Sequence, residues 1–124
     1  MAKILIADDE IHIRILLEQT LEELVDEGVD LIITANGQEA LETIEEEWPD
    51  LVFLDVMMPK MNGFEVCSKV KNELRLRDIY IILLTAKGQE FDKQKGLEVG
   101  ADEYMTKPFN PDEIVDKSRK ILGI

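Results

Sequence analysis

The sequence predicts an α/β fold in which helices pack on a five-stranded parallel β-sheet. Short apolar runs recur along the 124 residues, and segments with a helical spacing of apolar residues separate them. Strands joined in this way need crossover connections, which are right-handed and leave consecutive strands parallel. The central run, residues 51–54, is apolar at every position, as expected for a strand that is buried on both faces.

Each predicted strand is a short apolar run followed by polar residues or a turn. We expect strands at residues 3–7, 31–35, 50–55, 79–84 and 103–106. After the second of them, Asn36-Gly37 is expected to turn the chain.

Five helices are expected between and after the strands. They cover residues 11–27, a segment striped by Ala40, Leu41 and Ile44 that ends at Trp48-Pro49, residues 64–74, residues 90–99 and residues 112–122. Gly28 ends the first helix. The last helix should start at Asn110-Pro111-Asp112-Glu113, which reads as an N-cap, a proline at the first position and a capping-box acid.

The fourth predicted helix is a weak one. Its apolar residues are sparse, and Gly96 costs about 1 kcal/mol relative to alanine in a helix interior. This weakness fits either a surface helix or an element that moves.

The net charge of −13 excludes several partners. Acids concentrate at residues 18–30 and 39–47, so the surface repels nucleic-acid phosphates and anionic lipid. The one cysteine, Cys67, lies on a helical apolar stripe and is expected to be a buried structural thiol in a reducing compartment. The chain has no apolar run of membrane-spanning length and no signal peptide, so we expect a soluble cytoplasmic protein.

Residues with useful chemistry follow four of the predicted strands. Asp8 and Asp9 end the first strand, Asp55 the third, Thr85 the fourth and Lys107 the fifth. Each alone has an ordinary interpretation, such as a helix-start acid, a turn hydroxyl or a surface cation. Because parallel strands end at one edge of the sheet, their joint occurrence favours a single site, with three carboxylates in one crevice if the first and third strands are neighbours.

Carboxylates crowded together repel each other unless a cation offsets their charge. A ligand set of oxygen atoms indicates Mg²⁺ or Mn²⁺ rather than zinc. The ammonium of Lys107 and the hydroxyl of Thr85 would add a clamp for a phosphoryl group, and Asp55 could be the nucleophile that accepts it.

Over its whole length the chain resembles the receiver domain of two-component response regulators. The resemblance rests on Asp8-Asp9, Asp55-x-x-Met58-Pro59-x-Met61-x-Gly63, Thr85-Ala86, Gly100-Ala101-Asp102-Glu103-Tyr104 and Lys107-Pro108-Phe109. It implies a flavodoxin-like (βα)5 three-layer sandwich with strand order 2-1-3-4-5. We therefore expect one receiver domain over residues 1–124, with nothing left for an output domain.

The resemblance also implies a role for each site residue. Asp55 is expected to accept a phosphoryl group from a phosphohistidine on a histidine kinase or a histidine phosphotransfer protein. Asp9, Asp55 and the backbone carbonyl of Met57 would ligate Mg²⁺ directly, while Asp8 would act through water. Lys107 would pair with the phosphoryl oxygens.

A conformational switch is implied as well. Thr85 would swing to the phosphoryl group and Tyr104 would turn inward, which changes the surface of the fourth helix, fifth strand and last helix for a downstream protein. The Lys107-Pro108 peptide is expected to be cis. Met57 and Lys87 flank the path of the attacking water, and because Met57 orients water poorly we expect a phosphoryl lifetime that is intermediate or long.

Such a protein is a signalling switch with self-catalysed phosphotransfer and autodephosphorylation rather than an enzyme. The last helix lacks an Arg-rich dimerisation pattern, so the expected state is a monomer or a weak phosphorylation-dependent dimer. A phosphorylation-independent pseudo-receiver that acts as an interaction module remains the alternative.

Three other classes are disfavoured. In a flavodoxin, Asp8-Asp9-Glu10 would repel the phosphate of FMN. An aspartyl phosphatase needs Asp-x-Asp after the first strand, and an ATPase needs a P-loop; neither motif is present.

Overall fold

The computed structural model describes residues 2–86 and 91–124, without the side chains of residues 91–93. It contains one parallel sheet of five strands: β1 (Lys3–Ala7), β2 (Asp30–Thr34), β3 (Leu51–Asp55), β4 (Tyr80–Ala86) and β5 (Glu103–Lys107). Their order in the sheet is β2-β1-β3-β4-β5. This confirms the predicted fold and strand order.

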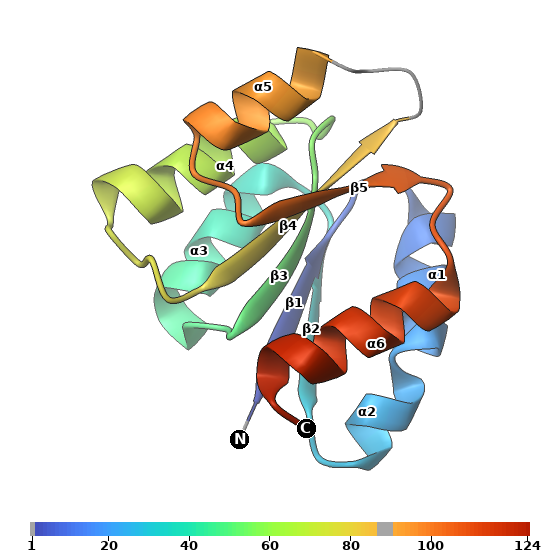
Figure 1. Ribbon diagram of the computed structural model, residues 1–124. Coiled ribbons are helices and arrows are strands. Elements are labelled where there is room, and N and C mark those ends of the chain that lie inside the picture. The colour runs from blue at the N-terminus through green and yellow to red at the C-terminus, as the bar shows by residue number, and fades with distance from the viewer. Residues whose placement is uncertain (1, 87–90) are drawn as a thin grey trace.

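Helices cover both faces of the sheet and make three layers (Figure 1). On one face lie α3 (Gly37–Glu47), α4 (Gly63–Ser68) with the π-helix η1 (Lys69–Glu73), and α5 (Phe91–Glu98). On the other face lie α1 (Ile11–Thr20), α2 (Glu22–Asp26) and α6 (Pro111–Leu122).

The side chains of the strands alternate between two hydrophobic cores, one on each face. Leu5, Val52 and Leu83 belong to the core beneath α3 and α4. Ile4 and Phe53 belong to the core beneath α1 and α6. Because both cores are filled, the polar residues at the strand ends are held by a rigid central sheet.

The first predicted helix is divided into two. Leu21 separates α1 from α2 with a ψ of 3°, although its amide still bonds to the Leu17 carbonyl at 2.9 Å. Leu17, Leu21 and Leu24 are all fully buried, so packing of this apolar stripe is kept across the break. Gly28, in the left-handed region at φ 103°, ends the segment as predicted.

The third predicted helix changes to π geometry after Ser68. The amide of Leu74 bonds to the carbonyl of Lys69 at 2.8 Å, five residues back. The wider turn leaves Leu74 exposed and Lys71 buried, where the Lys71 ammonium lies 2.7 Å from Asp102 Oδ2. That carboxylate also accepts a hydrogen bond from the amide of Ile81, so the π-helix is fixed to the start of β4.

Asparagine side chains cap the starts of α3, α4 and α6. Asn36 caps α3 by accepting a hydrogen bond from the Glu39 amide at 2.9 Å, so the predicted turn at Asn36-Gly37 is instead a helix start. Asn62 and Glu65 form a capping box on α4, and Asn110 caps α6 before Pro111, as predicted. Trp48, with φ 48°, ends α3.

Within the described part of the chain, no helix is long and apolar enough to cross a membrane.

Candidate functional site

Two buried carboxylates lie side by side where β1 and β3 end. Ala7 pairs with Leu54 across these neighbouring strands, so Asp8, directly after β1, lies beside Asp55, the last residue of β3. Their exposed fractions are 0% and 4%. The structure thus brings together acids that lie 47 positions apart in the sequence.

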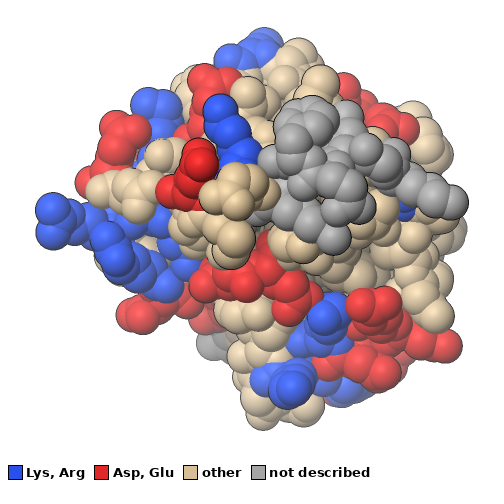
Figure 2. Space-filling view, turned by 45° about the horizontal axis from the view of Figure 1, so that its top comes forward, with Lys and Arg blue, Asp and Glu red and all other residues tan. Residues whose placement is uncertain are grey.

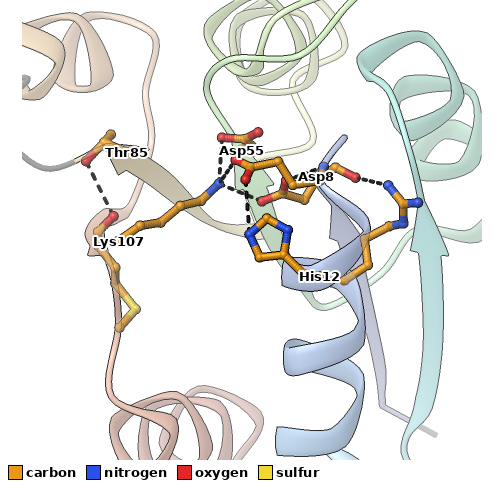
Figure 3. A network of polar contacts seen from close by, with 8 residues as sticks. Asp8, His12, Asp55, Thr85 and Lys107 are labelled. Carbon is orange, nitrogen blue, oxygen red and sulfur yellow. Dashed lines mark hydrogen bonds and ion pairs between the residues drawn. The ribbon is translucent and has the colours of Figure 1, made fainter.

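Lys107 reaches this pair from the end of β5, across the end of β4 (Figure 3). Its ammonium lies 2.8 Å from Asp8 Oδ2 and 3.2 Å from Asp55 Oδ1, with Glu10 Oε1 at 3.5 Å. The Lys107-Pro108 peptide is cis, which confirms that expectation.

The centre of the site is short of positive charge, because one ammonium faces two buried carboxylates. Burial, followed by the charge of Asp8, raises the pKa of Asp55 to about 7, although Lys107 opposes the shift. Burial alone would lower the pKa of Lys107, but its contacts with Asp8 and the charge of Asp55 outweigh burial and raise it. A further cation would relieve this imbalance.

Asp8 is fixed by the backbone around it. Its Oδ1 accepts a hydrogen bond from the Glu10 amide at 2.9 Å, and its carbonyl accepts one from Arg14 Nη1 at 2.7 Å. Its Oδ2 is buried and lies 2.8 Å from the Lys107 ammonium. A carboxylate oxygen has two lone pairs, so this oxygen can take a further partner besides the ammonium.

The acids of this edge are close enough to share a metal ion. Asp8, Asp9, Glu10 and Asp55 each offer a carboxylate oxygen, and these atoms lie within 4.8 Å of one another. Figure 2 turns this end of the molecule toward the viewer and shows acidic side chains gathered near the middle of the face. An all-oxygen set with exposed members suits a hard cation that keeps several waters, so the residues fit Mg²⁺ or Mn²⁺.

One member of the cluster, Glu10, was missed by the sequence prediction, and one predicted ligand, Met57, is not tested by it. Glu10 was not predicted to belong to the site, yet it contacts Lys107 and also lies 3.2 Å from the His12 ring. Its position next to Asp8-Asp9 was the available signal. Met57 follows β3 with a 64% exposed side chain, and ligation by its backbone carbonyl stays a prediction.

Thr85 and Tyr104, the two predicted switch residues, lie on neighbouring strands. Thr85, buried at the end of β4, donates a hydrogen bond to the Met105 carbonyl at 3.4 Å and stands apart from the Lys107 ammonium and its two carboxylates in Figure 3. Tyr104 is half-buried on β5 and packs against the core beneath α3 and α4. Lys87 lies outside the described residues.

The family follows from the match of this sequence to a family model described as the response regulator receiver domain, which covers residues 4–119. This chain belongs to the response regulator receiver domain family. Receivers of this family act as signalling switches in two-component systems, and the sequence resemblance to them is confirmed.

Curated relatives of this receiver are longer proteins. It is 48% identical over 120 residues to the alkaline phosphatase synthesis transcriptional regulatory protein PhoP of Bacillus subtilis, covering 97% of this chain and 48% of PhoP. It is 46% identical over 120 residues to the protein described as probable transcriptional regulator ycf27 of Pyropia yezoensis, covering 97% of this chain and 47% of that protein. The chain thus spans about half the length of the curated relatives it matches.

Solved receiver structures match over nearly the whole chain. The chemotaxis protein CheY4 of Vibrio cholerae matches with a TM-score of 0.84 at 35% identity, covering 98% of each chain. A BeF3-activated DrrB receiver domain matches with a TM-score of 0.86 at 34% identity, covering 100% of this chain and 99% of that one.

Proposed function

We propose that this receiver accepts a phosphoryl group on Asp55, with Mg²⁺ as cofactor. The donor is a phosphohistidine on a histidine kinase or a histidine phosphotransfer protein, in the cytoplasm. The observation that carries this proposal is the meeting of Asp55 with Asp8 and Lys107 at the ends of β1, β3 and β5.

The transfer exchanges one bond to phosphorus for another. A carboxylate oxygen of Asp55 bonds to phosphorus, the phosphorus–nitrogen bond of the donor breaks, and the departing imidazole keeps the electron pair and takes up a proton. The Lys107 ammonium, 3.2 Å from Asp55 Oδ1, lies where it offsets the charge of the incoming phosphoryl oxygens.

The acidic cluster supplies the metal ligands. Asp9, Asp55 and the backbone carbonyl of Met57 would hold Mg²⁺ directly, and Asp8 would hold it through water. When bound, Mg²⁺ supplies positive charge for the phosphoryl oxygens and helps to orient them.

The output is a change of the surface formed by α5, β5 and α6. A phosphoryl group adds about −1.5 to −2 charge and strong acceptor oxygens beside β4. The Thr85 hydroxyl leaves its 3.4 Å contact with the Met105 carbonyl for these oxygens, and Tyr104 then turns inward. A downstream protein reads the altered surface, while the net charge of −13 argues against direct contact of this chain with nucleic acid.

Hydrolysis resets the switch. A water oxygen bonds to phosphorus, the phosphorus–oxygen bond to Asp55 breaks, and phosphate is released with the free carboxylate. The exposed thioether of Met57 orients water poorly, so the phosphorylated state lasts longer than seconds. Following its decay by mass spectrometry after the phosphodonor is removed measures this, and loss within seconds would contradict it.

The direct test is incubation of the chain with acetyl phosphate and Mg²⁺, followed by measurement of the intact mass. We expect one added phosphoryl group on the wild-type chain and none on Asp55→Asn or in EDTA. Asp9→Asn should lose modification, whereas Glu46→Gln, an exposed control on α3, should keep it. A wild-type chain that stays unmodified with acetyl phosphate and with a phosphorylated histidine donor would instead be a phosphorylation-independent interaction module.

A further inference from the structure

Gly37, the first residue of α3, has no room for a side chain. A Cβ atom built on it would lie 1.8 Å from the carbonyl oxygen of Met61, 2.6 Å from its carbonyl carbon and 2.8 Å from its Cβ. Two of these three atoms are backbone, so a rotamer change of Met61 cannot relieve the overlap. The backbone of Met61 therefore occupies the space that a side chain at position 37 would take.

The segment pressed against Gly37 is the β3–α4 loop (residues 56–62), which begins directly after Asp55. Two backbone hydrogen bonds hold the loop in its conformation. The Gly63 amide donates to the Val56 carbonyl at 2.9 Å, and the Met61 amide donates to the Pro59 carbonyl at 2.8 Å. A Cβ on Gly63 would lie 2.3 Å from the Asp55 carbonyl oxygen. The carboxyl end of the loop is thus packed against the backbone of Asp55 through Gly63 and against Gly37 through Met61.

Of the two surfaces that meet at Gly37, α3 is the more strongly fixed. Ala40, Leu41 and Ile44 anchor it in the core, and Asn36 caps its start. The loop has a left-handed residue, Lys60 at φ 69°, and an exposed Met57. A side chain at position 37 would therefore displace the loop rather than the helix.

We propose that Gly37 is a positioning residue for the metal site. The missing side chain lets the β3–α4 loop seat on α3, and the seated loop places the Met57 carbonyl beside Asp55. This inference rests on the proposed function, since it assigns Gly37 a part in Mg²⁺ binding. It was not foreseen from the sequence, where Asn36-Gly37 reads as a turn.

The proposal predicts that Gly37→Ala weakens Mg²⁺ binding by about 10- to 100-fold, as is typical when a group that orients metal ligands is changed. Isothermal titration with Mg²⁺ measures the Kd, and urea unfolding in EDTA measures stability without the metal. Phosphorylation by acetyl phosphate should recover at saturating Mg²⁺, because Asp55 and Lys107 are unchanged.

Two control variants separate positioning from general destabilisation. Gly28→Ala strains the backbone at φ 103° with no atom within 4 Å of the new Cβ, at the start of β2 and away from the site. It should lose stability but keep the wild-type Kd. Met61→Ala removes the Met61 side chain beyond Cβ but leaves the backbone of residue 61 packed on Gly37. This variant should also keep the wild-type Kd.

A wild-type Kd in Gly37→Ala, or an equal loss of affinity in Gly28→Ala, overturns the proposal. If Gly37→Ala does not fold, the wild-type chain still provides a test by NMR. A Mg²⁺ titration should shift the amide signals of Gly37 and Met61 and leave that of Gly28 in place, and unmoved Gly37 and Met61 signals refute the coupling. A wild-type chain that binds no Mg²⁺ overturns the proposed function itself, which distinguishes the two failures.

Discussion

Neutralising Asp55 should stabilise this receiver when no divalent cation is present. Asp8 and Asp55 are both buried, and Lys107 supplies a single positive charge between them. The Asp55→Asn variant keeps the shape of the side chain and leaves Asp8 and Lys107 as a balanced pair. We expect its free energy of unfolding in EDTA to exceed that of the wild type.

The size of the effect follows from the raised pKa of Asp55. Burial, followed by the charge of Asp8, raises it from an ordinary value of 3.8 to about 7. Each pKa unit is worth about 1.4 kcal/mol, so the full cost of the ionised group is about 4 kcal/mol. The buried amide that replaces it must also find hydrogen-bond partners, so we expect a net gain of about 1 to 2 kcal/mol.

The pH dependence has a defined sign. Between pH 3.8 and about 7 the folded chain holds a proton on Asp55 that the unfolded chain has lost. The wild-type free energy of unfolding therefore falls as the pH rises through this window, and the loss is complete above about pH 7. The advantage of Asp55→Asn should be absent near pH 4 and largest near about pH 8.

Urea unfolding followed by circular dichroism measures the difference at several pH values, with Glu46→Gln as an exposed control that should behave like the wild type. Added Mg²⁺ should shrink or reverse the advantage, because a ligand at 100 times its Kd stabilises the folded state by about 2.7 kcal/mol and the variant lacks one ligand. An Asp55→Asn variant that is less stable than the wild type in EDTA at about pH 8 would refute the reasoning.

Three further predictions concern the rest of the fold. Lys71→Ala should lower the free energy of unfolding in urea by about 1 to 2 kcal/mol, because the buried Lys71 side chain is lost and the Asp102 carboxylate, whose side chain is 30% exposed, loses its 2.7 Å partner; a change within error would mean that water replaces the lysine. Burial raises the pKa of Cys67 to about 12, so a thiol reagent should not modify the folded chain but should react in urea, and rapid modification of the folded chain contradicts this. Asn62→Ala removes the hydrogen bond from the Glu65 amide to Asn62 Oδ1 and should cost about 1 kcal/mol in the same urea assay, whereas Glu65→Ala removes the reciprocal bond from the Asn62 amide and should cost less.

The parallel sheet could be predicted because a strand buried on both faces leaves a continuous apolar run. The run from Leu51 to Leu54 ends in Asp55, and that from Ile4 to Ala7 ends in Asp8, so the acids could be placed at strand ends from sequence alone. The prediction that β1 and β3 are neighbours in the sheet came only from the family resemblance, since the spacing of the strands along the sequence does not fix their order. The structure then gives the distances that the sequence could not, with Lys107 in contact with both acids.

The sequence predictions were wrong where a local residue pattern is compatible with two backbone conformations. Asn36-Gly37 suits a turn and a helix N-cap equally, because Asn accepts a backbone hydrogen bond in both. The sequence pattern of the third helix (Phe64, Cys67, Val70, Lys71 and Leu74) assumed a constant helical turn, and the π-helix changed it so that Leu74 is exposed while Lys71 stays buried. Contacts between distant segments decide both cases: Met61 fills the space beside Gly37, and Asp102 pairs with Lys71.

The electrostatic interactions at the site are unfavourable to folding, and the two hydrophobic cores offset their cost. Buried carboxylates at Asp8 and Asp55 share one ammonium, which lies 2.8 Å from Asp8 Oδ2 and 3.2 Å from Asp55 Oδ1. Such an arrangement weakens the folded state, but it leaves a place where an added charge has a large effect because little water screens it. A metal ion would add positive charge to the site and a phosphoryl group would add negative charge. The Lys107 ammonium contacts Asp8 and Asp55, the carboxylates that these groups would bind. The burial that we expect to make Asp55→Asn a stabilising change would also make Asp55 respond strongly to a bound cation or phosphoryl group, so we expect a site with balanced charges to be a poorer switch.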